Sequence, residues 1–531
     1  MAVDQVLVEE ERVTDVVPLK RALVSVYDKS GLELLAEILK RHGIAVFSTG
    51  KTLEILGKLG IRAGSVAAYT GSEEILGGRV KTLHPKLFAG ILSRRSKKEH
   101  RTTLKEQGWE NIDLVVVNLY PFEATVQRQG VSEEEAMETI DIGGPSLLRA
   151  AAKNFESVTA ITGPEEYELL AKELQANGGA TTLAFRKSCA RKVFALTARY
   201  DTLISRYLAE APWDVGEKLP ETIRLELLKK LDLRYGENPH QRGAWYSSGE
   251  WGGADSFEIL GGRELSYNNL RDLNAAYKLT LEFDLPFACI LKHTNPCGAA
   301  TGETLAEAYL DAYACDPLSA YGGIVGLNQK IDLDTAKILN ESVFLECILA
   351  PAFESEALEL LKEKKNLRIV ACRNWKGRRA AWRLFHLEDG FLVESVDDVT
   401  STKQDLRVVS KSRPSDAEIE SLLFAERIAK HTHSNAIVLA RGKKTVGIAG
   451  GITSRVDAVW LALRKAGERA KGSVLVSDAF FPMPDGVEKA AAAGVVAILA
   501  PSGSKKDAEV MAAAERAKIA LVFSSHRHFR H

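Results

Sequence analysis

Short apolar runs alternate with segments of helical periodicity in the first part of the chain. Residues 22–27, 44–47, 114–119 and 158–161 are compact apolar runs, each near a segment with helical spacing, and they predict buried strands. Strands that alternate with helices predict a mostly parallel sheet covered on both faces. Because such sheets bind ligands at the carboxyl ends of their strands, we expect the chemistry in the loops that follow these runs.

Local signals predict where the helices of this region begin and end. Ser30, with Glu33 three residues later, predicts a capping box, and Gly43 is placed to end that helix. Residues 181–211 have the spacing of one long helix, which Pro212 closes.

Beyond this helix the pattern changes to glycine-rich loops between helices, without a visible internal sequence repeat. We therefore expect a flexible leader over 1–17, a first domain over 18–212, a linker over 213–220 and a second domain over 221–531. The second domain is long enough for two subdomains.

Composition indicates an ordinary globular protein. The 531 residues are 45% hydrophobic and 27% charged, and the net charge of −1 gives no overall attraction to nucleic acid or to an acidic membrane. Six scattered cysteines without CxxC pairs predict free thiols rather than disulfides or structural zinc. The N-terminus lacks the layout of a secretory signal, and no apolar run is long enough to span a bilayer, so we expect a cytosolic protein.

Two segments of the first region carry groups that suit an anion. Ser48–Thr52 (STGKT) follows a predicted strand and opens a helix, where backbone N–H groups hold phosphate well, although Ala45 stands where a P-loop needs glycine. Residues 77–85 (GGRVKTLHP) combine two glycines with Arg79, Lys81 and Thr82 as donors for an anion or oxyanion. A capped helix without a ligand and a solvated basic loop are the alternatives.

Two further segments offer groups for proton transfer and polar contacts. Tyr120 lies in residues 118–122 (NLYPF) at a strand end, where core packing is the alternative. Asp141 precedes a glycine turn and a helix, and Lys153 lies further along that helix. An Asp and a Lys brought into one dry pocket could shuttle a proton; a helix acid and a surface lysine are the alternative.

The second region has its own polar clusters. Residues 234–241 (RYGENPHQ) are densely polar, and Lys292-His293 follows an apolar run, an arrangement that suits general acid–base chemistry beside a charge that stabilises an oxyanion. A zinc deaminase would need a second cysteine where Ala300 stands, so zinc is not supported. Asn435 could donate to an oxyanion, and Phe480 could stack on a flat heterocycle.

Two basic segments remain. Residues 524–531 (SSHRHFRH) resemble a tag or a nucleic-acid tail, but they directly follow an apolar strand, which predicts that they dock on the protein. Residues 362–383 hold nine Lys or Arg, which usually form a solvated face; an alternative is attraction of an acidic ligand tail.

Taken as an ordered set, these motifs resemble the bifunctional AICAR transformylase/IMP cyclohydrolase family from about residue 21 to the C-terminus. The resemblance rests on SVYDKSG, GGRVKTLHP, NLYPF, IDIGG, LLRAAAKN, RYGENPHQ, KHTNPCG, SDAFFP and APSGS. It implies a methylglyoxal-synthase-like parallel-sheet α/β domain followed by a larger transformylase domain of two cytidine-deaminase-like subdomains without zinc. It also implies the last two steps of IMP synthesis: formylation of AICAR by 10-formyltetrahydrofolate, then dehydrative closure of FAICAR to IMP.

The resemblance assigns residues to both expected sites. The catalytic residues that it implies are Lys81, Tyr120, Asp141 and Lys153 for ring closure and Lys292, His293 and Asn435 for formyl transfer. The implied binding residues of the first domain are Ser25, Lys29, Ser30, Thr49, Gly50, Thr52, Arg79, Thr82, Asn118, Gly143 and Gly144. Those of the second domain are Arg234, Tyr235, Asn269, Arg455, Phe480, Asp485 and Arg527.

The family also implies partners and shows two departures. It implies a homodimer with shared transformylase sites, no catalytic metal, a possible structural monovalent cation, and neither nucleic acid nor membrane as partner. Lys51 stands where the family usually has glycine, and Ile452 where it commonly has glutamine. The rival hypotheses are a non-catalytic nucleotide-binding regulator and a P-loop NTPase or nucleic-acid binder, which ATP turnover or salt-dependent oligonucleotide binding would favour.

Overall fold

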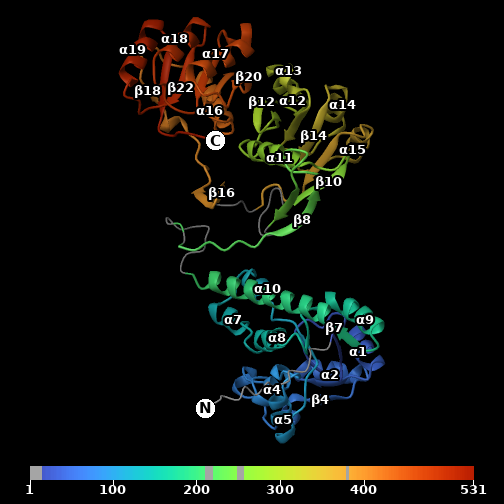
Figure 1. Cartoon of the computed structure of the whole chain (residues 1–531). Helices are drawn as coiled ribbons and strands as arrows, with labels where there is room; N and C mark the ends of the chain where they lie inside the picture. Colours follow the sequence, from blue (N-terminus) through green and yellow to red (C-terminus); the bar gives the residue numbers. More distant parts are fainter. Residues whose placement is uncertain (1–14, 210–218, 220, 248–255, 378–381) are drawn as a thin grey trace, which may run out of the picture. The chain divides into compact units, whose positions relative to one another are not determined.

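The computed structural model describes residues 15–209, 219, 221–247, 256–377 and 382–531. The chain forms two compact units, Met1–Arg224 and Leu225–His531, each with its own sheets (Figure 1). Apart from Leu219, the expected linker over 213–220 lies outside the described residues, as does Pro212. The units are therefore described one at a time.

Unit 1 is built on a five-stranded sheet with the order β4-β3-β2-β5-β6. All neighbouring strands in it are parallel, which confirms the prediction from the alternating pattern. The strands of this unit are β1 (Val16–Pro18), β2 (Arg21–Ser25), β3 (Ala45–Ser48), β4 (Ala63–Ser65), β5 (Leu114–Val117), β6 (Thr159–Ile161) and β7 (Ala180–Thr182).

Helices cover both faces of this sheet, because alternate side chains of each strand point to opposite faces. The main helices are α1 (Leu32–Arg41), α2 (Gly50–Lys58), α3 (Val66–Thr70), α4 (Pro85–Leu92), α5 (Lys98–Glu106), α6 (Phe122–Val126), α7 (Glu133–Glu138), α8 (Gly143–Lys153), α9 (Tyr167–Ala176) and α10 (Leu183–Tyr207). In β2, Ala22 and Val24 join a core with α1, α2 and α9, whereas Leu23 joins the core with α4, α8 and α10.

Two predicted boundaries of unit 1 differ from the structure. The leader ends earlier than residue 17, because β1 pairs antiparallel with β7 and buries Val17. Helix α10 begins at Leu183 rather than 181, since Thr182 caps it by accepting a hydrogen bond from the Phe185 N–H.

The capping box predicted at Ser30 is wrong. Gly31, with φ of +70°, is the N-cap of α1, and no side chain caps the helix. The Ser30 N–H instead donates to Asp28 Oδ1 at 2.9 Å, which places Ser30 in a turn before the helix. At the other end Gly43 follows the helix with φ of +62°, as predicted.

Unit 2 is built on a mixed twelve-stranded sheet with the order β10-β15-β14-β13-β11-β12-β20-β19-β21-β22-β23-β18. Its strands are β10 (Phe257–Gly261), β11 (Phe287–Lys292), β12 (Asn295–Thr301), β13 (Gly323–Leu327), β14 (Leu345–Ala350), β15 (Arg368–Cys372), β18 (Arg407–Val408), β19 (Ile437–Arg441), β20 (Lys444–Ala449), β21 (Val474–Ser477), β22 (Ala497–Pro501) and β23 (Ala520–Ser524). The helices are α11 (Tyr267–Thr280), α12 (Leu305–Cys315), α13 (Pro317–Ala320), α14 (Leu333–Glu341), α15 (Ser355–Lys362), α16 (Asp416–Lys430), α17 (Arg455–Ala466), α18 (Asp485–Ala492) and α19 (Asp507–Ala517).

The sheet consists of two halves with the same topology, although the sequence shows no repeat. In each half an antiparallel hairpin (β11-β12 or β19-β20) is followed by three mutually parallel strands and bordered by one antiparallel edge strand. The halves meet where β12 pairs antiparallel with β20. This agrees with the expectation of two subdomains.

Matching backbone contacts support the equivalence of the halves. After β13, Asn328 Oδ1 accepts the Phe287 N–H at 2.9 Å; after β21, Asp478 Oδ1 accepts the Ala436 N–H at 3.0 Å. In both halves, the same kind of side-chain hydrogen bond thus holds the start of the hairpin.

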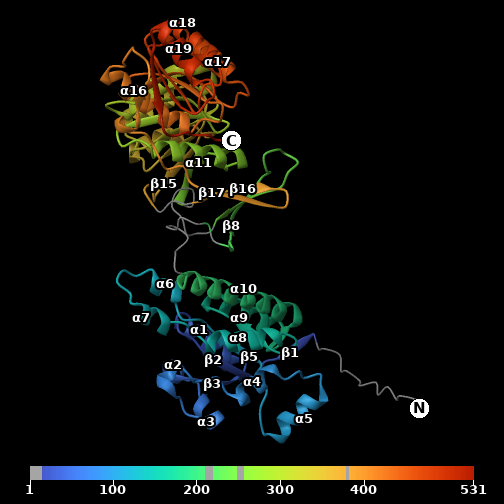
Figure 2. The ribbon, with the colours of Figure 1, turned by 90° about the vertical axis from the view of Figure 1, so that its left-hand side faces the viewer.

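Two small antiparallel ribbons stand apart from the large sheet (Figure 2): β8 (Leu228–Leu233) with β9 (Gly243–Ser247), and β16 (Trp382–Leu387) with β17 (Gly390–Ser395). No helix in the described part of the chain combines the length and apolar character that crossing a membrane requires.

Candidate functional sites in the two units

The carboxyl ends of β2 and β3 bring hydroxyl groups together in unit 1. Ser25 ends β2, and its Oγ lies 3.5 Å from Thr49 Oγ1 at the start of α2. Thr52, one turn into α2, donates to the Val26 carbonyl at 3.1 Å. Gly50, with φ of +48°, begins the helix and leaves its backbone uncovered, since a Cβ added there would meet no atom within 4 Å. Hydroxyls beside a helix N-terminus suit a phosphate.

A second loop crosses this end of the sheet. Asn118 follows β5, and its Oδ1 accepts the Asp28 N–H at 3.0 Å, while its Nδ2 donates to the Asp28 carbonyl at 2.9 Å. Lys29 donates to the carbonyls of Val26 and Tyr27, and burial, partly opposed by Asp28, lowers its pKa. Lys51 contributes further to that lowering, so the lysine that replaces the usual glycine of the family adds positive charge near Lys29.

Asp141 lies, partly buried, in the turn before α8. Its Oδ1 accepts the Gly144 N–H at 2.8 Å, and the backbone N–H of Tyr120 also donates to the carboxylate. Burial nevertheless raises the pKa of Asp141. Tyr120 packs edge-on against Tyr27, with ring centroids 5.4 Å apart. A carboxyl group with a raised pKa beside a tyrosine is suited to accept and return a proton.

The segment over 77–85 approaches the same turn. The space above Gly143 is limited by Thr82 Oγ1, 3.0 Å from a Cβ added there, so Thr82 lies beside the 141–144 turn. Lys81 pairs with Glu74 at 3.1 Å, and Arg79 pairs with Glu138 at the surface. Gly78 has φ of +94°, a backbone conformation that favours glycine, and the flexible ends of Glu74 and Lys81 lie beside it.

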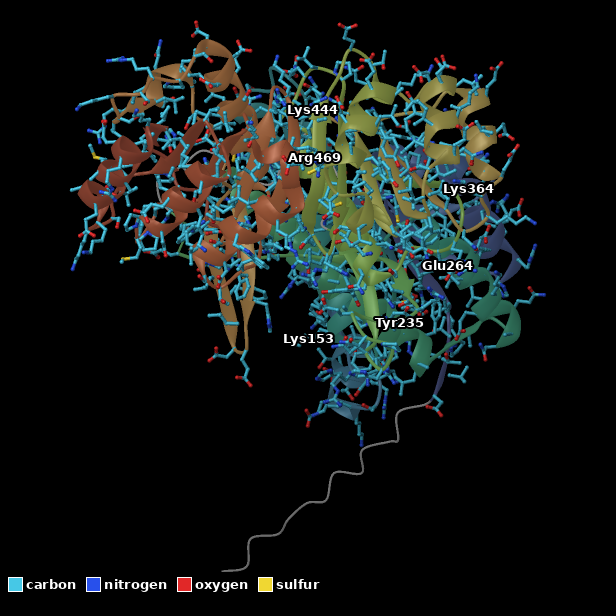
Figure 3. All side chains as sticks on the ribbon, turned by 90° about the horizontal axis from the view of Figure 1, so that it is seen from above. Lys153, Tyr235, Glu264, Lys364, Lys444 and Arg469 are labelled. Carbon is cyan, nitrogen blue, oxygen red and sulfur yellow. The ribbon has the colours of Figure 1, made fainter. Side chains whose placement is uncertain are left out.

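Lys153 is not brought to Asp141. Asp141 precedes α8, whereas Lys153 (labelled in Figure 3) is its last residue and is exposed. Eleven helical residues span about 16 Å, more than a lysine side chain bridges. The described part of unit 1 therefore does not hold Asp141 and Lys153 in one pocket, as the proton-shuttle hypothesis requires.

In unit 2 the turn between β11 and β12 carries the predicted Lys-His pair. Lys292 ends β11 and donates to the Tyr321 carbonyl at 2.6 Å. His293 and Thr294 both have positive φ, 54° and 62°, which is unusual for residues with a side chain. Asp272 of α11 holds the turn by accepting the Thr294 N–H at 2.6 Å. Strain of this kind is often found at functional sites.

This turn of the first half contacts a loop of the second half. Thr294 Oγ1 lies 2.8 Å from His433 Nε2, and Asn295 Oδ1 accepts the His433 N–H at 2.9 Å. Two residues later Asn435 donates through its N–H and Nδ2 to the Ile452 carbonyl, at 3.1 and 2.8 Å. Because only the carbonyl of Ile452 is used, the glutamine-to-isoleucine departure does not remove this contact.

Arg455 forms a buried ion pair with Asp478 beside this loop. Arg455 also donates to the Ala436 carbonyl at 3.2 Å, and the side chains of both charged residues are at most 7% exposed. Asp478 Oδ2 is buried without a hydrogen-bond partner in the described structure. Phe480 follows, half-buried; Asp485 begins α18, exposed, and accepts the adjacent Gly486 N–H at 2.8 Å.

The predicted binding residues Arg234 and Tyr235 lie in the loop after β8 (Tyr235 is labelled in Figure 3), and the guanidinium lies 5.5 Å from the phenol ring. This loop reaches α11, where Glu237 pairs with Arg271 at 2.5 Å. Asn269 is buried at the start of α11, and its Oδ1 accepts the Ser266 N–H in a capping box. Asn269 therefore also caps the start of this helix.

The C-terminal segment docks on unit 2, as predicted. His528 Nδ1 lies 2.8 Å from Asp397, and its backbone N–H donates to the Asp478 carbonyl at 3.0 Å. Arg530 donates to the His431 carbonyl at 2.6 Å. Arg527 remains exposed, 4.3 Å from the Phe529 ring. The tag and nucleic-acid-tail interpretations do not account for these contacts.

The basic stretch over 362–383 does not form one face. Arg378 and Arg379 lie outside the described residues, and most of the others are held by different acids. These pairs are Lys362–Glu359, Arg368–Glu346, Arg373–Glu258, Lys376–Asp284 and Arg383–Glu394. The stretch runs from the end of α15 through β15 to β16, so its basic residues lie on different elements.

All six cysteines are free and buried, as the scattered spacing predicted. Within the described residues, no three His, Cys, Asp or Glu side chains gather as metal ligands.

Sequence reasoning missed four residues that organise the second site: Asp272, His433, Asp478 and Arg530. Asp478 and His433 lie within or beside quoted motifs, so the motifs held a signal. Asp272 had none, because its contact joins segments far apart in the chain. Arg530 lies in the C-terminal segment that is expected to dock, but nothing in the sequence indicates its partner, the His431 carbonyl.

Comparison with known proteins gives concordant results. Residues 31–146 match the model of the MGS-like domain, and residues 151–465 match that of the AICARFT/IMPCHase bienzyme. The chain is 46% identical over 522 residues to the bifunctional purine biosynthesis protein PurH of Chlorobaculum parvum, covering 97% of this chain and 99% of that protein. PurH of Halalkalibacterium halodurans is 46% identical over 514 residues, covering 96% and 100%, and that of Acetivibrio thermocellus 43% over 518, covering 97% and 100%. The chain therefore belongs to the AICARFT/IMPCHase bienzyme family.

Proposed function

We propose that the two units divide two consecutive reactions, ring closure in unit 1 and formyl transfer in unit 2. The protein is a bifunctional formyltransferase and IMP cyclohydrolase that catalyses the last two steps of purine biosynthesis. The division is supported by one observation: each unit gathers its own set of polar side chains at loops of its own sheet. The proposed assignment gives cyclisation to the first domain, extended to the start of β1 at Val16, and transfer to 221–531.

Formyl transfer is assigned to the Lys292–Thr294 turn and the loop around Asn435. The ring amine of AICAR attacks the formyl carbon of 10-formyltetrahydrofolate, and His293 takes the proton that the amine loses. Lys292 and Asn435 stabilise the oxyanion of the tetrahedral intermediate. Collapse breaks the bond to the folate nitrogen, which receives the proton, and releases FAICAR and tetrahydrofolate.

Ring closure is assigned to the pocket around Asp141. The carboxamide nitrogen of FAICAR attacks its formyl carbon, while Lys81 and Tyr120 stabilise the developing oxyanion. Asp141 accepts the proton of the attacking nitrogen and returns it to the oxyanion. The resulting hydroxyl leaves as water with the proton of the former formamide N–H, while the C=N bond of the new ring forms. The raised pKa of Asp141 supports this role, because a buried carboxyl exchanges its proton more readily near neutral pH.

The remaining predicted residues are assigned to nucleotide binding. In unit 1, the hydroxyls at the ends of β2 and β3 hold the phosphate with Lys29. The other members of this set are Ser30, Arg79, Thr82, Asn118, Gly143 and Gly144. In unit 2, the binding set is Arg234, Tyr235, Asn269, Arg455, Phe480, Asp485 and Arg527.

A structural monovalent cation fits unit 2 at one atom. Asp478 Oδ1 is engaged by Arg455, whereas Oδ2 is a buried carboxylate oxygen without a partner in the described structure. A buried oxygen of this kind is costly unless a hydrogen bond or a cation satisfies it. Asp478 would hold such a cation, which would supply charge compensation rather than a reaction step.

The homodimer and the cytosolic location are also proposals. Exposed apolar side chains lie near Lys292, which donates to the Tyr321 carbonyl: Tyr321 is 59% exposed, and Phe344, whose ring packs against it, is 41% exposed. Leu318, in the preceding helix α13, is 88% exposed. Such a patch is typical of a protein interface, and a second copy there would close the transfer site. The free, buried cysteines suit a reducing compartment.

The division of labour is tested with the full chain, AICAR and 10-formyltetrahydrofolate. We expect His293→Ala to lower formyl transfer at least a hundredfold while the protein still closes supplied FAICAR to IMP, and Asp141→Asn to do the reverse. Tetrahydrofolate release and IMP formation are followed spectrophotometrically. Loss of both activities in either variant, with an unchanged thermal unfolding midpoint, would contradict separate sites.

Lys153→Gln tests the residue that the structure separates from Asp141. Because α8 lies between them, we expect cyclisation to fall less than in Asp141→Asn. An equal loss would show that Lys153 takes part through an arrangement other than the one in unit 1.

A further inference from the structure

The turn between β11 and β12 is a two-residue hairpin loop with an unusual composition. Lys292 pairs with Asn295, so His293 and Thr294 alone make the connection. Both have positive φ, 54° and 62°, the signs that the type I′ turn of such hairpins requires. That turn favours asparagine and glycine, whereas a β-branched residue such as Thr294 is strained in it. The fold therefore has to hold this turn against the preference of its own backbone.

The second half of the large sheet shows the same hairpin with a glycine. The corresponding hairpin, β19-β20, also has a two-residue connection, and its register shifts at the same place, so the positions of the two hairpins correspond one to one. There Gly442 takes the first turn position, with φ of +62°. The first half has His293 at this position. An imidazole is thus kept where glycine would cost less, which indicates a functional reason for the strain.

Asp272 of α11 holds the backbone of the turn from the first half of the sheet. Its Oδ1 accepts the Thr294 N–H at 2.6 Å, and the carboxylate also accepts the His293 N–H. Asp272 is partly buried, and hydrogen bonds to an ionised acceptor are stronger than those between neutral groups. One side chain therefore stabilises two consecutive N–H groups in the orientation that the strained turn gives them.

His433 holds the same turn from the second half. Its Nε2 lies 2.8 Å from Thr294 Oγ1, and the Thr294 hydroxyl donates to the His293 carbonyl at 2.7 Å. Because the hydroxyl has one proton, which the carbonyl accepts, His433 Nε2 is the donor to Thr294. The backbone of His433 is fixed as well: its N–H donates to Asn295 Oδ1 at 2.9 Å, and its carbonyl accepts the Gly451 N–H at 2.7 Å.

The peptide between His293 and Thr294 is thus held at both of its polar groups. Its N–H donates to Asp272, and its carbonyl accepts the Thr294 hydroxyl, which His433 orients. Rotation of this peptide would convert the turn to the type that has positive φ at its first position only, and would so relieve the strain at Thr294. The same rotation would break all of these hydrogen bonds.

We propose that Asp272 and His433 are positioning residues for formyl transfer, which hold the strained turn in the shape that presents His293 to the substrates. The proposal rests on the proposed assignment of formyl transfer to this turn. Because each residue acts through the turn, its loss lowers the rate of the chemical step rather than the affinity for AICAR or 10-formyltetrahydrofolate. A reacting group misplaced by about 1 Å costs roughly a hundredfold in rate.

The experiment measures kcat and KM of formyl transfer by the full-length protein, through release of tetrahydrofolate. We expect Asp272→Ala to lower kcat roughly 10- to 100-fold, while KM for each substrate changes less than about threefold. Asp272→Asn keeps an oxygen that can accept the N–H groups of the turn, so it should retain much more activity than Asp272→Ala. His433→Leu should also lower kcat, and His433→Gln, whose amide can donate to Thr294, should restore most of it.

Replacing Thr294 with glycine separates positioning by Asp272 from participation in the chemistry. Glycine adopts positive φ without strain, so Thr294→Gly lowers the cost of the turn when Asp272 is lost. We therefore expect Asp272→Ala/Thr294→Gly to be at least about fivefold more active than Asp272→Ala, with Thr294→Gly alone measured to complete the cycle. A carboxylate that exchanged protons with the substrates would not be replaced by a change in backbone preference.

Asp332→Ala is the matched control. Asp332 also accepts a backbone N–H, that of Thr335 at 2.8 Å, but it caps α14 instead of holding the turn. Its loss should leave kcat and KM of formyl transfer unchanged. All variants should still close supplied FAICAR to IMP, and their thermal unfolding midpoints identify any variant that does not fold.

Three results would overturn the proposal: wild-type kcat in both Asp272→Ala and His433→Leu, a rise in KM as large as the fall in kcat, or a loss that neither Asp272→Asn nor Thr294→Gly recovers. Should Asp272→Ala not fold, wild-type kcat in His433→Leu would by itself overturn it. Wild-type protein that transfers no formyl group would instead contradict the proposed function, which is a different result.

Discussion

At the residue scale, the Arg455–Asp478 pair links stability to the transfer site. Both side chains are nearly inaccessible, and both contact the backbone of Ala436, next to Asn435. A buried charge that loses its partner is strongly destabilising, whereas an exposed pair contributes little. The pair therefore fixes the position of the amide that we assign to the oxyanion.

Replacing Asp478 with Asn should destabilise unit 2. We expect a loss of about 3 kcal/mol in the free energy of unfolding, because the Arg455 guanidinium then faces an amide instead of a carboxylate. Urea unfolding followed by fluorescence measures it. Asp311→Asn, which breaks the exposed pair of Lys444 and Asp311 (2.9 Å), is the control and should cost under about 1 kcal/mol. Equal losses in the two variants would refute the importance of burial.

Single residues of the sites were predictable where a motif ends a strand. Ser25, Asn118 and Lys292 lie at or directly after strand ends, where parallel and mixed sheets expose their loops. Asp272 was not predictable, because its role comes from a contact with a residue 22 positions away in the sequence. For Arg530 the docking of its segment was predictable, but not its contact with His431, 99 positions away. Lys153 is a different case: the motif named the residue, but the sequence did not show its distance from Asp141.

At the scale of elements, caps decide where the helices begin. Thr182 accepts the Phe185 N–H and donates to Glu173 Oε1 at 2.7 Å, so it joins the start of α10 to α9. The spacing of Ser30 and Glu33 fits a capping box equally well, but Gly31 takes the N-cap position instead. The spacing of two residues describes the helix alone, whereas the position of the cap also depends on what packs against it. At Gly31, an added Cβ would lie 3.2 Å from the Tyr167 side chain, so this position suits a residue without a side chain.

Removal of the Thr182 hydroxyl should weaken the start of α10. We expect Thr182→Ala to lower the free energy of unfolding of unit 1 by about 1 kcal/mol, and Thr182→Ser to recover most of it. Chemical denaturation monitored by circular dichroism checks this. Thr202→Ala, within α10, removes a hydroxyl that only donates to the Ala198 carbonyl, and its effect should stay within about 0.5 kcal/mol.

At the scale of the whole molecule, the C-terminal segment closes unit 2. Burial opposes a charge on His528, but Asp397 at 2.8 Å and Glu426 at 3.8 Å outweigh it and raise the pKa of His528 to about 9. A raised folded pKa means that the charged histidine stabilises the native state. That contribution is complete below about pH 6.5 and is lost as pH rises toward 9.

The thermal unfolding midpoint should therefore decrease as pH rises from 6.5 to 9. We expect His528→Asn to be less stable than wild type at pH 6, and the two proteins to converge near pH 9. Scanning calorimetry across this pH range checks the prediction. A constant difference between them would mean that packing of the ring, rather than its charge, holds the segment.

The antiparallel contact of β12 with β20 has a consequence for any attempt to shorten the protein. Each strand is the outermost member of its own six-stranded group and is covered only because the other group lies against it. The ladder between them is short, with Ala300 paired to Lys444, but a fragment that contained one group alone would still end in an edge strand without its neighbour, and identical fragments could pair there. Such fragments should precipitate or pair with themselves, so a shortened protein should keep both halves of unit 2.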